Sequence, residues 1–370
     1  MSHLQSTSGE SFPLHSLNWR GTDGSLLNIL PASSFDPADI KPSSPASLWR
    51  YRTAMALPEE VEAVSFQEGF TPLIPIMWAG KEVHLKMDYL FPSGSYKDRG
   101  ATVLMSWAKH LGVNDVVQDS SGNAGAAIAN YATLAGIRAR IFVPASTSPA
   151  KLVQLKAFGA EINLIPGSRE DTAKAAVKAA EGNFYASHVW HPMFFEGTKT
   201  FAYEICEQLG WSAPDTVVLP AGNGTLLIGA FLGFQELKQA GVIDRLPKLV
   251  GIQAASCSPL FKSFHGYSKG STSGTMAEGI AIAEPRRGGQ MIEIVKQSGG
   301  TFLAVEEEEI KESLLAMCLK GYFIEPTSAA VVAGLSQYIR QHAEADEKIV
   351  SVLTGNGLKS SDKIQKILSH

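Results

Sequence analysis

Lys97 is the residue whose position most needs a chemical explanation. It lies in FPSGSYKDRGATVL, residues 91–104, where small turn-forming residues lead into an apolar helical pattern. The amino end of a helix already carries partial positive charge, so a cation is disfavoured there. Either the amine is neutralised by forming an imine with an aldehyde, or the side chain faces water and has no special role.

The other lysines close to predicted turns have a simpler explanation. Lys151 and Lys156 lie on one amphipathic helical pattern, Lys199 lies on another, and Lys359 follows the last glycine-rich turn. We interpret each of them as a solvated surface charge.

A glycine-rich turn at residues 220–229, PAGNGTLLIG, follows a β-rich apolar run. Gly222 and Gly224 remove side chains ahead of a helix, which exposes N–H groups suited to a phosphate. The segment lacks the G-K-[ST] of a Walker loop and does not match G-x-G-x-x-G. A strand-to-helix turn without a ligand is an equally good alternative.

Two further turns carry short polar side chains. DSSGNAG, residues 119–125, leads into a small-residue helix and favours an anion such as a carboxylate, although a helix cap at Ser121 or Asn123 explains it equally well. LTGNGLKSSD, residues 353–362, leaves the Thr354 hydroxyl at a strand end, where it could meet a ligand heteroatom or act as a turn residue.

The combination of these features is more informative than any one of them. It comprises a lysine at a helix start, a phosphate-type turn, an anion-type turn and a lone hydroxyl. An aldehyde cofactor with a phosphate tail needs this set, with the lysine forming the imine.

The elements that must position these residues follow an α/β pattern. Short β-rich runs alternate with helical stretches, which indicates parallel sheets with ligands at the carboxyl ends of the strands. The predicted strands lie in 81–87, 115–121, 139–145, 161–167, 216–220, 248–254 and 348–354, and the predicted helices lie in 95–112, 123–137, 148–160, 168–182 and 225–241.

The composition limits the function classes. The chain has 370 residues, 45% hydrophobic and 18% charged, with a formal net charge of -4, which argues against nucleic-acid binding through bulk positive charge. No secretory signal and no apolar run long enough to span a membrane is visible. The three cysteines have no C-x-x-C spacing, so we predict a cytoplasmic protein without disulfides or a metal site.

Five segments together resemble the fold-type II pyridoxal-phosphate enzymes, and among these the threonine synthases most. They are PSGSYKDRG, SSGNAG, PAGNGTLLIG, EPTSAA and LTGNGLK, and the likeness runs in order from about residue 48 to the C-terminus. The resemblance implies an α/β fold of two domains, similar to the tryptophan synthase β subunit, each a mostly parallel sheet flanked by helices. It also implies pyridoxal 5'-phosphate as cofactor and a homodimer.

The resemblance implies a role for each motif. Lys97 would form the Schiff base and move the α-proton, Asn123 would bond the ring hydroxyl, and Thr354 would face the pyridine nitrogen. The remaining implied residues are Gly222, Asn223, Gly224 and Thr225 for the cofactor phosphate, and Ser120, Ser121, Gly122 and Ala124 for the substrate carboxylate. A hydroxyl at Thr354 does not force a proton onto the ring nitrogen, which favours elimination and replacement over transamination.

The implied domains are an N-terminal extension (1–50), a larger cofactor-binding domain (51–108 with 201–370) and a smaller α/β domain (109–200). Four positions depart from the threonine synthases. His188 and Val189 replace a polar pair, Phe194 stands where an arginine contacts the substrate phosphate, and Ala124 replaces a threonine. Either other residues bind that phosphate, or the substrate has no phosphate. The candidates to replace the arginine are His188, His191, Lys199, Arg286 and Arg287. We favour packed or surface roles for the two histidines.

These departures leave three hypotheses open. The first is a pyridoxal-phosphate lyase of threonine-synthase type, converting O-phosphohomoserine or a related small amino acid. The second is a serine/threonine-type ammonia-lyase, which the segment 275–285 with Glu278 resembles more closely. The third is a regulatory or binding protein of the same fold without turnover, against which the intact Lys97 argues.

Overall fold

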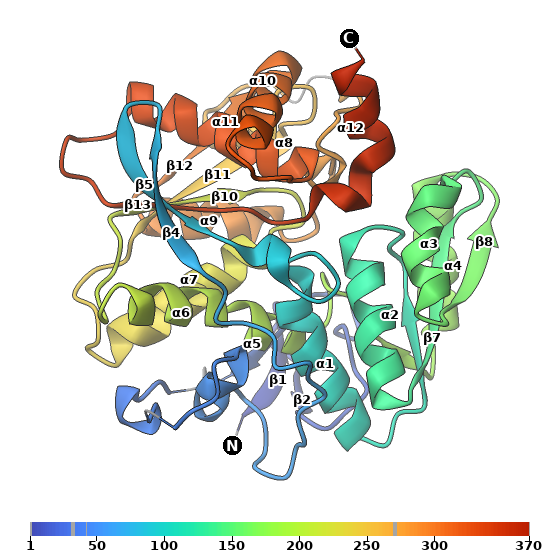
Figure 1. The fold of residues 1–370 in the computed structure, drawn as a ribbon. Coiled ribbons are helices and arrows are strands. Elements are labelled where there is room, and N and C mark those ends of the chain that lie inside the picture. The colour runs from blue at the N-terminus through green and yellow to red at the C-terminus, as the bar shows by residue number, and fades with distance from the viewer. Residues whose placement is uncertain (1, 31–33, 42, 269–271, 370) are drawn as a thin grey trace. The chain divides into compact units, whose positions relative to one another are not determined.

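The computed structural model describes residues 2–30, 34–41, 43–268 and 272–369 (Figure 1). The chain divides into two compact units. Unit 1 comprises Met1–Gly69 and Lys97–Thr198, and unit 2 comprises Phe70–Tyr96 and Lys199–His370. The domain boundaries at residues 50, 108 and 200 remain a prediction.

Unit 1 is built on a parallel sheet of the order β8-β7-β6-β9. Its strands are β6 (Asp115–Gln118), β7 (Arg138–Pro144), β8 (Glu161–Ile165) and β9 (Phe184–Tyr185). Its helices are α1 (Lys97–His110), α2 (Asn123–Ala135), α3 (Pro149–Ala157), α4 (Arg169–Ala179) and α5 (Met193–Thr198). Near the N-terminus, β1 (His3–Ser6) pairs antiparallel with both β2 (Ser11–Pro13) and β3 (Leu27–Leu30).

Unit 2 contains a six-stranded sheet of the order β12-β11-β10-β13-β5-β4, in which only the edge strand β4 runs antiparallel to its neighbour. Its strands are β4 (Leu73–Trp78), β5 (Lys81–Lys86), β10 (Thr216–Pro220), β11 (Lys248–Ala254), β12 (Thr301–Val305) and β13 (Ile349–Val352). Its helices are α6 (Thr200–Gln208), α7 (Thr225–Gln239), α8 (Pro259–Phe264), α9 (Gly288–Gln297), α10 (Glu307–Leu319), α11 (Pro326–Gln341) and α12 (Ser361–Leu368).

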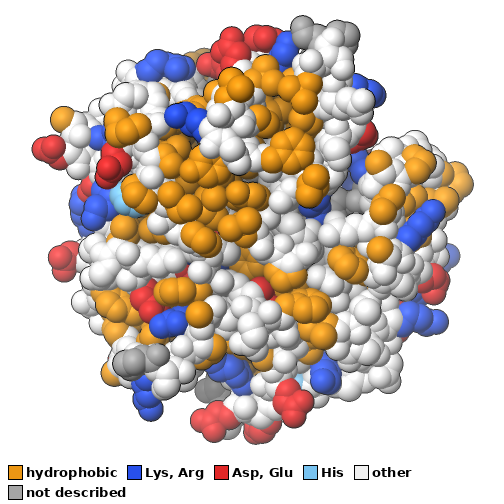
Figure 2. Space-filling model, viewed as in Figure 1, with side chains coloured by type: hydrophobic (Ala, Val, Ile, Leu, Met, Phe, Trp, Pro, Cys, Tyr) orange, Lys and Arg blue, Asp and Glu red, His pale blue; other side chains and the backbone are white. Residues whose placement is uncertain are grey.

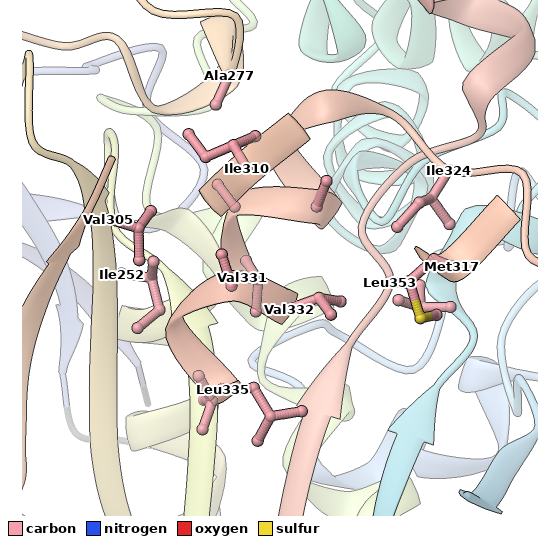
Figure 3. Close-up of a cluster of buried hydrophobic side chains, with 14 of the residues drawn as sticks. Ile252, Ala277, Val305, Ile310, Met317, Ile324, Val331, Val332, Leu335 and Leu353 are labelled. Atoms are coloured by element: carbon pink, nitrogen blue, oxygen red, sulfur yellow. The ribbon is translucent and has the colours of Figure 1, made fainter. Parts of the chain in front are cut away.

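The apolar runs of unit 2 form central strands because both faces of the sheet are covered. All five residues of β10 and all four of β13 are buried, as expected for parallel strands between helices. In the core, Val331, Val332 and Leu335 of α11 lie with Ile252 of β11 and with Leu353, which follows β13 (Figure 3). This packing fixes the first turn of α11 beside the end of β13.

The predicted α/β fold with mostly parallel sheets is confirmed, and so are the predicted strands and helices. Lys81–Lys86, Asp115–Gln118 and Ile349–Val352 are strands, and Lys97–His110 and Thr225–Gln239 are helices, within a few residues of the expected limits. Within the described ranges, no helix has the length and apolar character needed to cross a bilayer.

Candidate active site

Lys97 is the first residue of α1, as the sequence predicts, and its side chain is partly buried. The helix packs closely on α5 through two glycines. A Cβ on Gly100 would overlap the ring of Phe194, and a Cβ on Gly197 would overlap the Arg99 carbonyl. Packing therefore explains the glycine at position 100. Without a side chain there, the fully buried Phe194 can lie against the first turn of α1, which begins at Lys97.

His188 is a buried neutral imidazole in the electrostatic field of Lys97. Burial lowers its pKa well below the usual range, and the charges of Lys97 and Arg169 act in the same direction. Its Nδ1 has no hydrogen-bond partner within the described residues. Burial also lowers the pKa of His191, to about 3. Both histidines are buried, so the prediction of packed histidines fits better than that of surface ones.

The polar turn ahead of α2 presents an uncapped helix end. Gly122 holds the cap position, and no side-chain cap bond is made there. The alternative of a cap at Ser121 or Asn123 is therefore wrong. Ser120 Oγ instead accepts from the Gly122 amide at 3.3 Å, inside the turn. Ser120, Ser121 and Asn123 are partly buried, Gly122 is exposed, and Ala124 lies buried in the helix.

The strand that leads into this turn is fixed by side-chain bonds. Gln118 Nε2 donates to the Ala186 carbonyl at 2.7 Å, and the Gln118 side-chain oxygen accepts from the Asp119 amide at 2.7 Å. Asp119 pairs with Arg169 at 2.8 Å, although the Arg169 side chain is 56% exposed. Arg169 thus provides a half-exposed cation beside the anion-type turn.

The glycine turn of unit 2 is held from behind by other backbone. A Cβ on Gly222 would lie 2.7 Å from the Gly279 carbonyl oxygen, and a Cβ on Gly224 would overlap the side chain of Met291. Gly224 has φ +78°, the left-handed conformation that favours glycine. No side-chain cap bond is made at Gly224, the cap position of α7, and a helix start of this kind suits an anion. Asn223 is partly buried and Thr225 is buried.

Tyr96 connects two of the predicted site positions of unit 2, the glycine turn and Thr354. Its hydroxyl lies 2.9 Å from Thr225 Oγ1 of the glycine turn, and its amide donates to the Thr354 carbonyl at 3.0 Å. Burial raises the pKa of Tyr96, so it remains a neutral phenol. Since β10 and β13 are parallel neighbours, the glycine turn and Thr354 share one edge of the sheet. The next residue after Tyr96 is Lys97.

Thr354 belongs to a buried hydrogen-bond cluster. Its Oγ1 donates to Glu325 Oε1 at 2.9 Å and lies 2.9 Å from Ser328 Oγ. The amides of Thr354 and Gly355 both donate to Ser328 Oγ, at 2.8 and 3.1 Å. Sequence reasoning missed Tyr96, Ser328 and Glu325. The only signal for the last two was the EPTSAA segment, residues 325–330, and Tyr96 lay unnoticed inside the lysine motif.

Lys199 corrects the prediction of a surface charge. Its side chain is fully buried and pairs with Glu236 of α7 at 3.0 Å. The helical pattern was read correctly, but the partner lies 37 positions away and could not be seen. Of the other lysines, Lys156 is exposed, while Lys151 and Lys359 are partly buried, with Lys359 Nζ 2.7 Å from the Ser93 carbonyl.

The remaining candidates for phosphate contact have different surroundings. Arg287 is buried before α9, where its guanidinium donates to Gln290 at 3.0 Å and burial lowers its pKa to about 10. Arg286 is exposed. Glu278, at the position that resembles the ammonia-lyases, pairs with Lys363.

These residues fit a cofactor with an aldehyde and a phosphate. The amine of Lys97 is a suitable nucleophile, and the uncapped start of α7 is a suitable cradle for a phosphate. Within the described ranges no group of His, Cys, Asp and Glu could hold a metal ion.

Comparison with known proteins gives the same result. The family model described as pyridoxal-phosphate dependent enzyme matches residues 64–355. The threonine synthase of Methanocaldococcus jannaschii is 33% identical over 96% of this chain and 92% of its own. The threonine synthase of Synechocystis sp. is 36% identical over 90% of this chain and 88% of its own.

Solved structures share the fold at lower identity. A fungal L-serine ammonia-lyase from Rhizomucor miehei matches with a TM-score of 0.71 and 20% identity, over 83% of this chain and 99% of its own. Maize serine racemase matches with a TM-score of 0.67 and 22% identity, over 82% of this chain and 94% of its own. The chain belongs to the pyridoxal-phosphate-dependent enzymes of fold type II, and within them it is a carbon–oxygen lyase of the threonine-synthase type.

Proposed function

We propose that the enzyme converts O-phosphohomoserine and water to threonine and orthophosphate. The catalytic part of this proposal rests on two hydrogen bonds of Tyr96. Its hydroxyl bonds Thr225 Oγ1, and its amide donates to the Thr354 carbonyl. These bonds fix the residue before Lys97 to both of the unit 2 positions proposed for the cofactor.

In this proposal each predicted site residue keeps one task. Lys97 would hold the cofactor through its aldehyde, and its amine would move the substrate α-proton. The N–H groups of Gly222, Asn223, Gly224 and Thr225 would bind the cofactor phosphate. Thr354 would contact the ring nitrogen, and Asn123 would bond the ring hydroxyl. The bound cofactor supplies an electron sink for the pair left when the α-proton is removed.

The turn before α2 is proposed to bind the substrate carboxylate. Its uncapped N–H groups and the hydroxyls of Ser120 and Ser121 are suitable donors, and Gly122 and Ala124 contribute backbone. The Nδ1 of neutral His188, which has no hydrogen-bond partner within the described residues, is proposed to orient the substrate without adding charge.

A phosphate on the substrate is supported by the cations of unit 1. Arg169 is half exposed beside this turn, and both Arg169 and Lys97 act electrostatically on His188. Arg169 is therefore the proposed replacement for the arginine that Phe194 displaces. A charge-assisted bond from a guanidinium to a phosphate contributes about 1.5–3 kcal/mol.

An ammonia-lyase acting on threonine or serine is the second candidate. The specific observation in its favour is Phe194, which offers no charge at the arginine position. Its ring is fully buried against Gly100, however, so it leaves no exposed apolar surface for a small side chain. Phe194 therefore gives this candidate no apolar pocket for the substrate side chain.

One assay separates the two candidates. The purified protein, loaded with pyridoxal 5'-phosphate, is given O-phosphohomoserine, threonine or serine, and orthophosphate and 2-oxoacid are measured. We expect phosphate and threonine from O-phosphohomoserine. In Arg169→Met we expect kcat/KM for this substrate to fall at least tenfold. Release of 2-oxoacid from threonine without phosphate release from O-phosphohomoserine would favour the lyase.

We also propose a cytoplasmic homodimer. Figure 2 shows apolar side chains gathered over unit 2, in the region between the labels β4, α10 and α11 of Figure 1. Met77 of β4 is 59% exposed, and Leu90, shortly after β5, is 53% exposed. Exposed apolar patches of this kind often mark protein interfaces. Light scattering of the purified chain tests this, and a monomer mass would contradict it.

A further inference from the structure

The N-terminal extension and the turn between α4 and β9 border an open hollow, lined by residues 17–22 and 180–183. Both segments belong to unit 1. The volume of the hollow is about 510 Å³, which lies within the range of small-molecule sites in proteins. Glu10 fixes the extension here, because its carboxylate accepts from the Thr22 amide at 2.8 Å and from the Thr22 hydroxyl. The wall formed by the extension is therefore held by its own hydrogen bonds.

Aromatic packing anchors the same wall. Trp19 is 7% exposed, and its ring meets the rings of Tyr185 and Trp190 edge-on, with centroids 4.8 and 5.3 Å apart. The Arg20 guanidinium lies over the Trp19 ring, 4.5 Å from its centroid. An aromatic face attracts a cation without occupying its N–H donors, so this guanidinium can still bond a ligand.

The two walls carry charges of opposite sign that do not neutralise each other. Arg20 belongs to one wall and the exposed Glu181 to the other. Among the described residues, neither side chain has a hydrogen-bond or ion-pair partner, and the Trp19 ring is the one contact of the Arg20 charge. The half-buried Asn18 adds a carboxamide that is also unbonded within the described part of the chain. The hollow thus offers a cation, an anion and an amide to a ligand.

These groups match a free α-amino acid. A guanidinium binds a carboxylate through two parallel hydrogen bonds, and a carboxylate accepts from an ammonium group. A ligand with both charges satisfies both walls, whereas a simple anion would face Glu181 without a counter-charge. Leu17 is 47% exposed in the lining and supplies apolar surface, which suits an aliphatic side chain on the ligand.

The wall of the hollow is connected to the turn before α2 through Tyr185. This residue lies opposite Val117 in the pairing of β9 with β6, the strand that leads into that turn. Burial raises the pKa of Tyr185 well above its usual range, and the nearby carboxylate of Asp119 acts in the same direction. Asp119 in turn pairs with Arg169 at 2.8 Å. Tyr185 therefore contacts Trp19 on one side and interacts with the start of the turn on the other.

We propose that the hollow is an effector site for a free α-amino acid with an aliphatic side chain. The carboxylate of the effector binds Arg20, and its ammonium group binds Glu181. Its binding changes the affinity of the turn before α2 for the substrate, with Tyr185 as the positioning residue between the two sites. Couplings of this kind change an affinity about 5- to 150-fold. The inference goes beyond the proposed reaction and does not depend on which substrate is converted.

Calorimetric titration of the holoenzyme with L-leucine, L-valine and L-isoleucine tests the binding. In both Arg20→Met and Glu181→Gln the dissociation constant should rise at least about tenfold, because a charge-assisted hydrogen bond is lost. Isocaproate and isoamylamine carry the side chain of leucine with only one of its two charges, and each should bind at least about tenfold more weakly than leucine. Lys174→Met, on an exposed cation of α4 outside the hollow, is the control and should bind as the unmodified protein does.

Steady-state kinetics test the effector role. A saturating amount of the bound amino acid should change KM about fivefold or more in the unmodified protein and leave it unchanged in Arg20→Met. Tyr185→Phe keeps the ring beside Trp19 and removes the hydroxyl near Asp119. This variant should bind the amino acid normally and lose the change in KM. An amino acid bound at the cofactor instead would alter the aldimine absorption band and would bind Arg20→Met undiminished.

The inference is overturned if none of the three amino acids binds, or if the unmodified protein, Arg20→Met and Glu181→Gln bind them equally well. Binding through Arg20 that leaves KM unchanged would overturn the effector role. The calorimetric measurement requires no turnover. A protein that binds an aliphatic amino acid through Arg20 and Glu181, yet releases no phosphate from O-phosphohomoserine, would refute the proposed substrate and leave the binding site standing.

Discussion

The turn before α7 in unit 2 and the turn before α2 in unit 1 share a local design and differ in their surroundings. Each follows a parallel strand, has glycine at the cap position and leaves the helix start without a side-chain cap. The α7 turn is buried, backed by Gly279 and bonded to Tyr96. The α2 turn is partly exposed, and Gly122 lies open to solvent.

This difference matches the two proposed ligands. A resident cofactor is best held by a turn whose backbone cannot move, because preorganised donors need no rearrangement on binding. A substrate must enter and leave at every turnover, which requires an open turn. The same anion-binding geometry would therefore serve permanent binding in one unit and exchange in the other.

The largest expected effect concerns the buried ion pair between Lys199 and Glu236 of α7. Replacing Lys199 by methionine leaves Glu236 buried without its cation, which should cost about 3–5 kcal/mol of the free energy of unfolding. Urea unfolding measures this. The matched control is Lys156→Met on exposed α3, expected to change stability by less than about 0.5 kcal/mol. Equal free energies of unfolding for the two variants would show that the buried Lys199–Glu236 pair does not stabilise the protein.

The next effect compares the two cap glycines directly. Gly224→Ala should destabilise the protein by about 1–2 kcal/mol from its left-handed conformation alone, and more from overlap with Met291. It should also weaken cofactor binding at least tenfold. Gly122 has φ -99°, and the nearest atom to an added Cβ, Ser120 Oγ, is 3.9 Å away. Gly122→Ala should therefore fold normally and keep its cofactor. Cofactor titration and thermal unfolding of both variants decide.

The two units should also differ in how pH affects their stability. Unit 1 buries uncharged histidines, whereas unit 2 buries a charged pair. His191 has a pKa of about 3 when folded and an ordinary value near 6.5 when unfolded. As the pH falls below 6.5 the unfolded chain takes up the proton first, so stability falls. Between pH 7 and pH 5 the unmodified protein should lose about 2 kcal/mol more than His191→Gln does.

Unfolding titrations at both pH values measure that loss. His110→Gln, at the exposed end of α1, is the control and should retain the full acid sensitivity. If His191→Gln and the unmodified protein lose stability in parallel, His191 is not the buried neutral group described here.

The smallest effect concerns the open turn. Ser121→Ala removes one donor to the substrate carboxylate, worth about 1 kcal/mol, so KM should rise about fivefold. The cofactor dissociation constant should stay the same, because the turn before α7 is untouched. Steady-state kinetics and cofactor titration check both values. A changed cofactor affinity with unchanged KM would reverse the roles assigned to the two turns.

Local patterns were enough to predict most elements and the positions of the turns before α2 and α7. The strand of residues 216–220, the glycines after it and the helix from Thr225 all follow from hydrophobic runs and turn chemistry, which act between near neighbours. The same holds for the start of α1 at Lys97.

What the sequence could not reveal depends on pairing between distant residues. Lys199 looks like a surface lysine until Glu236 is brought beside it, and Thr354 looks like a free hydroxyl until Glu325 and Ser328 surround it. The cap before α2 was ambiguous because Ser and Asn favour caps in general. Only the backbone geometry shows that Gly122 takes that position without a side-chain bond.

The claim on which the mechanism depends is that Lys97 is the lysine joined to the cofactor. Borohydride reduction of the holoenzyme makes this bond permanent, and peptide mass spectrometry then locates the pyridoxyl group. The account predicts the label on Lys97 alone, and no label with complete loss of turnover in Lys97→Ala. A label on Lys199, Lys151 or Lys359, or turnover that survives in Lys97→Ala, would contradict it.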